Sequence, residues 1–438
     1  MKFIVVVLVA LLALASSMKG QAVATYTSGF SGTVPASYFG LTCGAPASPA
    51  CLPATNRTWD ESYSGTGVAW GSIDTGVTCG TYNWANLDGL IAELQALGVT
   101  DFVYTLGYVP ACDSSNPTGT GCSYGNGSCY PNSSTTNFQN FVNALVSRYC
   151  GTIKFYEGWN EANTTSTWTA SISLLNTYQQ VLYTAVHSTA NCSVGGVNPN
   201  QVLSPAMSQP GFYTATELNN GSIGYPLNVS YWLHTLLANG GGSYFDILAI
   251  HSYGTSGTCY SGPEVYVTDV ANVKQQLATI NLTKPIWNTE MNWGQNSCVT
   301  QTDAVLDSWI SRWFYLHAAL GFSRALWYEY IGGSWSGTSF GSLLVGSNQV
   351  ATYQQAQSVM VGATWPVCNQ FANSNWTCTI TRASPPGYIG IAVWNSTGTG
   401  SYTVPSGITQ YRDVLGNVTA TSGGSTVAVT ASPLLFEN

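Results

Sequence analysis

From about residue 38 to residue 361, short runs of β-branched and aromatic residues alternate with longer amphipathic stretches. The short runs are typical of buried strands, and the longer stretches repeat their apolar residues at helical spacing. Strands are predicted at residues 38–42, 67–73, 101–107, 152–156, 202–206, 246–251, 285–289 and 325–330. Helices are predicted between them at residues 86–97, 137–149, 172–187, 263–280 and 302–319. Eight such alternations predict an α/β fold, the (β/α)8 TIM barrel.

Two long insertions rich in glycine, serine, asparagine and cysteine interrupt this pattern, at residues 43–60 and 113–134. They follow the first and third predicted strands, where barrel enzymes carry the loops that face their substrate. We interpret both insertions as loops at the rim of the barrel. The alternative is solvated surface decoration held together by disulfides.

After about residue 366 the pattern changes to short alternating segments separated by turn residues, which predicts a small accessory domain resembling a β-sandwich. The chain is therefore divided into a signal peptide, an N-terminal strand that is a candidate to join the β domain, the barrel, and the C-terminal β domain. In order, these segments are residues 1–22, 23–37, 38–365 and 366–438.

The start of the chain is typical of a secretory signal peptide. Lys2 precedes an aliphatic run over residues 3–15, and small residues follow it. A transmembrane anchor is the competing interpretation, but the run is shorter than the roughly 20 residues that cross a bilayer. Cleavage fits a position after Ser17 or one near Gln21. We expect a secreted, extracellular protein that does not associate with a membrane after cleavage.

Charged residues make up 7% of the chain, with 11 Lys and Arg against 19 Asp and Glu. Nucleic-acid binding relies on clustered positive charge, so this composition argues against a nucleic-acid partner. Solubility must come from small polar residues and attached sugars. Glycosylation sequons occur at Asn56, Asn126, Asn132, Asn163, Asn191, Asn220, Asn228, Asn281, Asn375, Asn395 and Asn417. Chance occurrence is the alternative in a chain so rich in Asn, Ser and Thr, and we expect several sites to be occupied.

The chain contains 12 cysteines, and in a secreted protein these are expected to form disulfides. Cys368 and Cys378 are close enough to join a local hairpin, and Cys259 and Cys298 each lie just beyond a predicted strand, so we predict these two pairs. Zinc binding by the cysteines in and beside the second insertion is the competing hypothesis, but their spacing lacks a CxxC element and no histidine is near. These cysteines are Cys112, Cys122 and Cys129.

Two glutamates in charge-poor, aromatic surroundings are the candidates for chemistry. Glu161 ends the run FYEGWNE after the fourth predicted strand, and Glu290 ends the run PIWNTE at the seventh. Barrel strands place their carboxyl ends around one site, so these two side chains can meet there. A carboxyl pair is what glycosidic cleavage requires, since one group protonates the leaving oxygen while the other attacks the anomeric carbon or activates water. A surface ion pair is the alternative interpretation.

The segments WNEAN (159–163), HSY (251–253) and WNTE (287–290) together resemble the glycoside hydrolases of clan A, and family 39 most closely. The resemblance covers the barrel and extends to the β domain that family 39 members often carry. It implies a retaining glycosidase in which Glu161 is the general acid/base and Glu290 the nucleophile. One difference is that Ala162 and Asn163 follow the acid/base glutamate where the family usually has Pro-Asn or a similar pair. A glycan on Asn163 would crowd the site unless the loop turned outward.

Five neighbours are candidates for sugar binding. Asn160 is suited to donate a hydrogen bond to the 2-hydroxyl of the sugar, and His251 and Tyr253 are expected to hold Glu290 ionised. Trp327 offers an apolar face for a sugar ring, and Glu329 follows it on the same predicted strand. For His251 and Tyr253 the alternative is a core pair whose hydrogen bonds are satisfied inside the protein. Glu157, inside the fourth strand, is interpreted as structural.

These observations predict a secreted retaining glycoside hydrolase that acts on a neutral polysaccharide, oligosaccharide or glycoconjugate, with no metal and no organic cofactor. A transglycosylase is chemically the same up to the covalent intermediate and remains an alternative. A second alternative, from another class, is a secreted carbohydrate-binding or structural protein that keeps the barrel without its activity.

Overall fold

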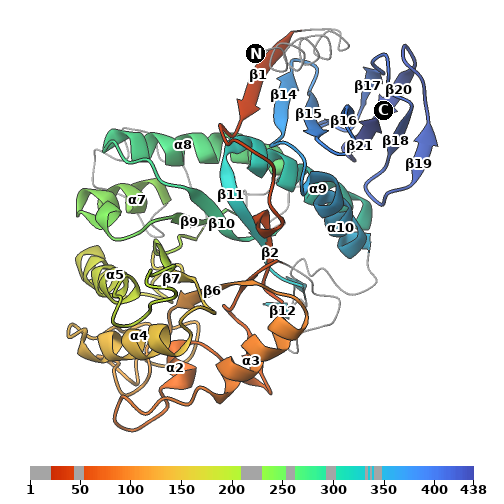
Figure 1. Ribbon diagram of the computed structural model, residues 1–438. Helices are drawn as coiled ribbons and strands as arrows, with labels where there is room; N and C mark the ends of the chain where they lie inside the picture. Colours follow the sequence, from red (N-terminus) through yellow and green to blue (C-terminus); the bar gives the residue numbers. More distant parts are fainter. Residues whose placement is uncertain are drawn as a thin grey trace.

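The computed structural model describes residues 21–43, 54–208, 229–252, 262–292, 302–330, 334–335, 338–339 and 348–438. Figure 1 shows a barrel surrounded by helices, with a β domain beside helices α9 and α10. Within these ranges no helix has both the length and the apolar composition needed to cross a membrane. Nearly all of the predicted signal peptide lies outside the described residues.

Eight parallel strands form the barrel, in the order β8-β7-β6-β3-β2-β11-β10-β9. They are β2 (Phe39–Leu41), β3 (Thr55–Arg57), β6 (Asp101–Leu106), β7 (Phe155–Trp159), β8 (Gln201–Leu203), β9 (Leu248–His251), β10 (Ile286–Met291) and β11 (Phe322–Trp327). Isolated parallel bridges from Leu203 to Ile247 and from Ser208 to His251 connect the two end strands. The ring is therefore nearly closed, which confirms the predicted TIM barrel.

Helices cover the outside of this ring (Figure 1). They are α2 (Trp70–Ile73), α3 (Ala85–Ala96), α4 (Thr136–Arg148), α5 (Ile172–Val186), α7 (Val229–Ala238), α8 (Tyr266–Thr279), α9 (Asp303–Leu320) and α10 (Asn348–Met360). Helix α9 begins at the N-cap Thr302, whose side chain accepts a hydrogen bond from the Val305 amide, and ends at Gly321 in the left-handed conformation. From Asp307 onward every residue of α9 is buried, because this helix lies between the barrel and the β domain.

The second predicted barrel strand, at residues 67–73, is wrong. Most of that segment forms the short helix α2, and the second strand is β3, inside the insertion at residues 43–60 that we interpreted as a rim loop. The segment Thr55-Asn56-Arg57 is fully buried although all three residues are polar. These polar side chains can be buried because they form hydrogen bonds and ion pairs inside the protein. The segment therefore has no hydrophobic pattern from which a strand could be predicted.

The β domain is a seven-stranded antiparallel sheet in the order β1-β14-β15-β16-β21-β18-β19. Its strands are β1 (Ala22–Thr27), β14 (Val367–Phe371), β15 (Asn375–Arg382), β16 (Tyr388–Asn395), β18 (Gln410–Arg412), β19 (Val418–Ala420) and β21 (Leu434–Glu437). Alternate residues of β15 and β16 face helix α9 and the hairpin of β17 (Gly400–Thr403) with β20 (Thr426–Val429). The N-terminal strand thus shares a sheet with the C-terminal part of the chain.

The described residues contain four disulfides: Cys79–Cys112, Cys122–Cys129, Cys150–Cys192 and Cys368–Cys378. The last joins β14 to β15 at directly paired positions of the hairpin, as expected from the sequence. The first two use all three cysteines of the zinc hypothesis, which leaves no thiolate there to bind a metal. The predicted pair Cys259 and Cys298 lies outside the described residues.

Three of the predicted glycosylation sites are corrected by the structure. Asn56, Asn375 and Asn395 are fully buried, and their amide nitrogens donate hydrogen bonds inside the protein. A glycan on these nitrogens would have no room, so these asparagines are structural. By contrast, Asn126, Asn281 and Asn417 are exposed, and Asn132 and Asn191 are half-buried. Asn220 and Asn228 lie outside the described residues.

Candidate active site

A buried arginine organises the polar groups at the carboxyl ends of the barrel strands. Arg57, the last residue of β3, is fully buried. Its Nε atom lies 2.7 Å from Glu157, its Nη1 atom 2.7 Å from Glu290, and its Nη2 atom 2.7 Å from the Asn160 amide oxygen. Glu157 also accepts a hydrogen bond of 2.6 Å from Thr105. A guanidinium donates in a fixed planar fork, so Arg57 sets the positions of three side chains from two other strands and a loop.

The two candidate glutamates converge on one imidazole. Glu290 lies within β10, and Glu161 lies two residues beyond the end of β7. The Nδ1 atom of His251 is 3.0 Å from a Glu161 oxygen and 3.6 Å from a Glu290 oxygen. The ligand atoms of these three residues all lie within 4.8 Å of one another. The fold therefore brings together two carboxylates that are far apart in sequence.

The contact with Arg57 fixes the tautomer of His251. The Nη2 atom of Arg57 lies 3.1 Å from the His251 Nε2 atom, and arginine can only donate. Nε2 must therefore be the acceptor, which leaves the proton on Nδ1, facing the two glutamates. His251 is then a neutral ring whose Nδ1 group donates a hydrogen bond to Glu161 at 3.0 Å, whereas Glu290 at 3.6 Å is beyond hydrogen-bonding distance. This assignment follows from the hydrogen-bond network. The sequence predicted that His251 would hold Glu290, and its hydrogen bond to Glu161 corrects that prediction.

The same reasoning orients the side chain of Asn160. Its oxygen accepts from Arg57, so its Nδ2 group is the end turned away from the guanidinium. Trp59 packs close to Asn160 because position 107 is glycine: a Cβ atom there would lie 2.5 Å from the Trp59 ring and 3.6 Å from the Asn160 Cβ. A donor amide held rigidly beside two carboxylates is suited to bind a hydroxyl group.

Glu161 is held in an unusual backbone conformation with φ of 46°. Burial alone raises the pKa of its carboxyl, but hydrogen bonds from His251 and Ser208 and the positive charges around it have the opposite effect, so its pKa lies below the ordinary glutamate value. Part of this lowering requires a charged His251. The Arg57 contact favours a neutral His251, which removes one of the charges that lower the pKa of Glu161. The effect of burial, which raises the pKa of a carboxyl, then has more weight.

Glu161, His251 and Glu290 also have the spacing of a metal site. Their immediate partner, however, is the guanidinium of Arg57, which lies 2.7 Å from Glu290 and occupies the acceptor nitrogen of His251. A second cation there would face a fixed positive charge, and the ring nitrogen nearest the glutamates carries the proton. The arrangement therefore fits a hydrogen-bonded carboxylate pair better than a metal centre.

Strand β10 is anchored from outside by a second histidine. The Nδ1 atom of His317 lies 2.8 Å from the Trp313 carbonyl oxygen, so this nitrogen carries the proton, and Nε2 accepts from the Asn288 amide at 2.9 Å. Burial lowers the pKa of His317 to about 3, so the ring stays neutral. Helix α9 thereby fixes β10 two residues before Glu290.

The structure corrects the role expected for Trp327. This side chain is fully buried and faces the helices, with its ring 4.8 Å from the Trp313 ring on α9. Strand β11 ends at Trp327, so the predicted strand at 325–330 begins and ends too late, and Glu329 lies beyond the strand. Glu329 is 7% exposed and close enough to raise the pKa of Tyr328. Tyr253 lies outside the described residues.

Sequence reasoning missed several residues that the structure brings to the site. Arg57 lies in the unrecognised strand β3, and Asp60 follows three residues later. Tyr124 comes from the insertion at residues 113–134, and Tyr328 directly follows β11. The Tyr328 hydroxyl donates a hydrogen bond of 2.9 Å to Asp60. The triplet Trp59-Asp60-Glu61 next to a lone arginine was the available signal, since charged residues are rare in this chain.

Asn163 is buried and does not carry a glycan into the site. Its amide nitrogen donates to the Ser208 carbonyl at 2.9 Å, and its oxygen accepts from the Ser208 amide at 2.8 Å. This pair of hydrogen bonds ties the segment after Glu161 to the segment after β8. The pattern WNEAN therefore ends in a structural asparagine.

Solved structures similar to this chain include several glycoside hydrolases. A family 39 glycoside hydrolase from Bacteroides cellulosilyticus WH2 has a TM-score of 0.64 and 14% identity, with 92% of this chain and 80% of that chain covered. A glucosidase from Croceicoccus marinus has a TM-score of 0.62 and 11% identity, covering 95% and 97%. The catalytic domain of a family 30 xylanase C from Talaromyces cellulolyticus has a TM-score of 0.52 and 16% identity, covering 95% and 98%.

The chain has the fold of the clan A glycoside hydrolases. Comparison of the sequence with protein-family models and with curated proteins gives no match. At these identities the likeness establishes the fold, and the chemistry must be argued from the side chains described above.

Proposed function

We propose that this protein is a secreted retaining glycoside hydrolase in which Glu290 is the nucleophile and Glu161 the general acid/base. The observation that carries the proposal is the convergence of both carboxylates on His251, with the relevant oxygen and nitrogen atoms within 4.8 Å of one another. Retaining enzymes hold their two carboxyl groups about 5 Å apart, whereas inverting enzymes leave room for a water between them.

The surroundings of the two glutamates suit different roles. Glu290 is 2.7 Å from Arg57, and an adjacent guanidinium stabilises the ionised form that a nucleophile requires. Among the described residues Glu161 forms no ion pair with Arg57, and its side chain is 18% exposed, so a leaving group can reach it. The assignment of acid and nucleophile follows from this asymmetry.

Double displacement then proceeds in two steps, formation of a glycosyl ester on Glu290 and its hydrolysis. A Glu290 oxygen bonds to the anomeric carbon while the glycosidic bond breaks, and Glu161 gives its proton to the leaving oxygen. Water next attacks the anomeric carbon, Glu161 takes the water proton, and the ester bond to Glu290 breaks. Asn160 is placed to donate its amide hydrogen to the sugar 2-hydroxyl as positive charge develops on the ring.

The substrate we propose is a neutral glycan. Among the described residues, no lysine or arginine other than Arg57 forms an ion pair with Glu157, Glu161 or Glu290, and Arg57 is already engaged by two of them. The solved structures of similar fold include a glucosidase and a xylanase, which is compatible with neutral sugars. Transglycosylation shares the first step and differs only in the acceptor that resolves the ester.

The deciding test is Glu290→Ala with azide rescue. We expect the wild type to hydrolyse an aryl glycoside from a neutral-sugar panel, and the variant to lose at least about 10⁴-fold in kcat, because the attacking oxygen is gone. Azide should restore turnover and yield a glycosyl azide of inverted configuration. Glu93→Gln, on helix α3 outside the barrel, is the matched control and should behave as wild type.

Product analysis separates the remaining possibilities. Added acceptor sugars that give longer products faster than free sugar would identify a transglycosylase. A wild type that binds sugars, turns over none of the panel and binds equally well as Glu290→Ala would contradict the enzyme proposal and favour a carbohydrate-binding protein.

A further inference from the structure

Three side chains from separate loops meet beside Glu290 and are not used by the mechanism above. Asp60 follows β3, Tyr124 lies in the disulfide-linked insertion, and Tyr328 follows β11. The Tyr328 hydroxyl donates to an Asp60 carboxylate oxygen at 2.9 Å, and the Tyr124 hydroxyl is close enough to lower the pKa of that carboxyl. Glu290 is close enough for its charge to act on all three groups. We call these three residues the Asp60 cluster.

The residues of the Asp60 cluster are held in place by hydrogen bonds and ring contacts with neighbouring residues. Trp59 is almost fully buried, and its indole nitrogen donates to the Tyr124 hydroxyl at 2.9 Å while the two rings pack 5.0 Å apart. The amide of Tyr328 donates to the Met291 carbonyl, and the Tyr328 carbonyl accepts from Asn292 at 2.7 Å. Both ends of the Asp60 cluster are thus fixed to the strands that hold Arg57 and Glu290.

Asp60 itself stays accessible. Its side chain is exposed, and its backbone adopts the left-handed conformation with φ of 58°. An ionised carboxylate has about four acceptor positions, and the two tyrosine hydroxyls occupy at most two of them. Asp60 therefore retains capacity to accept hydrogen bonds from a molecule that lies against Glu290.

We propose that the Asp60 cluster is the subsite that accepts a ring hydroxyl of the sugar attacked by Glu290, and that it selects neutral sugars over uronic acids. This inference rests on the proposed function. The carboxylate accepts from a hydroxyl of the sugar. The tyrosine hydroxyls line the same position, and because the Tyr328 proton is already donated to Asp60, the Tyr328 oxygen can only accept from the sugar. A uronate carboxylate in that position would meet Asp60 and Glu290, with Arg57 already bound to Glu157 and Glu290.

The pH dependence of this selection has a definite sign. Although Asp60 keeps an exposed face, the protein packed around its carboxylate removes part of its hydration, and this desolvation and the charge of Glu290 raise its pKa to about 6, while the two tyrosine hydroxyls and Arg57 act in the opposite direction. The groups that face Asp60 are thus Glu290, Arg57, Tyr124 and Tyr328. Above pH 6 Asp60 is ionised and repels a uronate. Below pH 6 it becomes neutral, so discrimination against the uronide should weaken.

The test compares wild type with Asp60→Asn on one aryl glycoside, its monodeoxy analogues and the matching aryl uronide. Asparagine tolerates the left-handed conformation, so the fold is preserved. In the wild type, one deoxy position should cost about 10- to 100-fold in kcat/KM, the effect of removing a hydrogen bond to a charged group. In Asp60→Asn the same deletion should cost less than about threefold, and the preference for the neutral substrate over the uronide should fall about tenfold at pH 7.

Two further variants keep the test decisive. Tyr328→Phe retains the ring but removes a donor to Asp60, and should weaken the same deoxy effect without changing which position shows it. Asp413→Asn, in a turn of the β domain, is the control and should behave as wild type.

Equal deoxy losses and unchanged neutral-to-uronide preference in wild type and Asp60→Asn would overturn the inference while leaving the glycosidase intact. Inactivity of the wild type on every substrate would instead overturn the proposed function. In that event, calorimetric binding of the neutral sugar and of the uronic acid to both proteins would still decide the inference: equal selectivity refutes it, and a loss of selectivity in Asp60→Asn supports it.

Discussion

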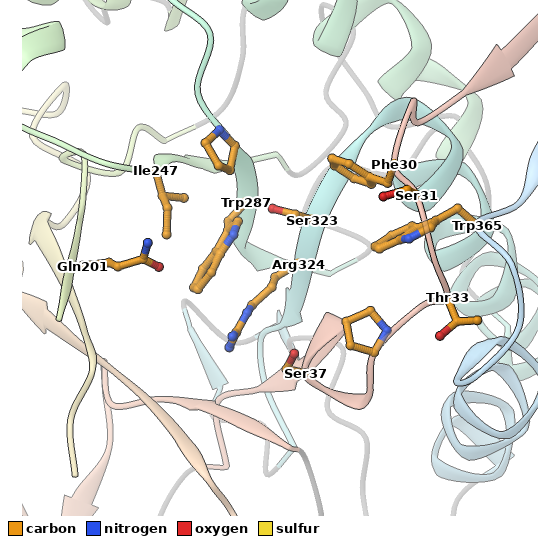
Figure 2. A pocket seen from close by; sticks show the side chains of 12 residues that line it. Phe30, Ser31, Thr33, Ser37, Gln201, Ile247, Trp287, Ser323, Arg324 and Trp365 are labelled. Atoms are coloured by element: carbon orange, nitrogen blue, oxygen red, sulfur yellow. The ribbon is translucent and has the colours of Figure 1, made fainter. Parts of the chain in front are cut away.

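The two ends of the barrel each contain an arginine between strands, and they use it differently. At the carboxyl end, Arg57 contacts Glu157, Glu290, Asn160 and His251. At the amino end, the guanidinium of Arg324 lies 4.3 Å from the centre of the Trp287 ring and 4.5 Å from that of Phe155, and it pairs with Asp101 at 2.8 Å. Figure 2 shows Arg324 and Trp287 on the wall of a cavity of about 490 Å³ that also reaches Phe30 and Trp365.

This contrast shows how the end with the proposed active site differs from the other end of the barrel. Asp101 balances Arg324, and the remaining faces of that guanidinium are covered by aromatic rings. Arg57 is instead surrounded by more carboxylates than it can neutralise, with Glu157 and Glu290 in contact and Glu161 and Asp60 nearby. Excess negative charge in a buried site lowers the stability of the fold. It is therefore typical of sites in which the carboxylates take part in binding or catalysis.

Arg57→Met should have the largest effect of any change that spares the two candidate catalytic glutamates. It leaves Glu157 buried without a cation and frees Glu290 and Asn160, so we expect a loss of about 3–5 kcal/mol in unfolding free energy and at least about 10³-fold in kcat/KM. Urea unfolding and aryl glycoside hydrolysis measure the two quantities. The double variant Arg57→Met with Glu157→Gln should recover part of the stability and none of the activity. Recovery of both would show that Arg57 acts only on the fold.

Arg324→Met should affect stability alone. The variant keeps an apolar side chain between the two rings and removes one partly buried ion pair, and Lys154, 3.7 Å from Asp101, can still compensate that carboxylate. We expect a loss of about 2 kcal/mol in unfolding free energy. The activity, kcat/KM, should stay within about twofold of wild type. An activity loss comparable to that of Arg57→Met would abolish the distinction between the two ends.

Asp113→Asn should have the smallest effect of the three variants, and it should raise the unfolding free energy instead of lowering it. Asp113 is buried in the insertion at residues 113–134, hydrogen-bonded by Asn137, and burial raises its pKa to about 6. Because the folded pKa exceeds the unfolded value of about 4, the wild type loses stability as the pH rises between these values. The variant should therefore be more stable by about 1 kcal/mol at pH 7 and indistinguishable at pH 3. Thermal unfolding across this range tests it, and equal differences at both pH values would contradict it.

The barrel could be predicted because most of its strands bury apolar side chains on both faces, whereas β3 could not. Strand β3 is only three polar residues, and its burial depends on partners that are distant in sequence, such as Glu157. Glu161 and Glu290 were recognised from local patterns at strand ends. Arg57 was missed because the partners that mark it as functional are visible only once the ring has closed.

The error at Trp327 has a different cause. Residues of a strand alternate between the barrel interior and the helices, and a shift of one residue exchanges the two faces. Leu326 belongs to the interior cluster while Trp327 faces α9, so Tyr328 rather than Trp327 reaches the site. The sequence contains a run of aromatic residues here, and their composition does not show which of them face the barrel interior and which face the helices. The Asp60 cluster needed tertiary structure for the same reason.

The pairing of β1 with β14 also has a consequence for biosynthesis. Ala22 faces Phe371, so the partner of the first strand is translated 349 residues later (371 minus 22). At about 5–20 residues per second, β1 waits roughly 20 to 70 seconds on the ribosome without its neighbour. During that interval a strand with open backbone groups is exposed and can pair with other chains. The sheet of the β domain can therefore form only after β14 has been translated, and the yield of folded protein will depend on how well this early strand is shielded until then.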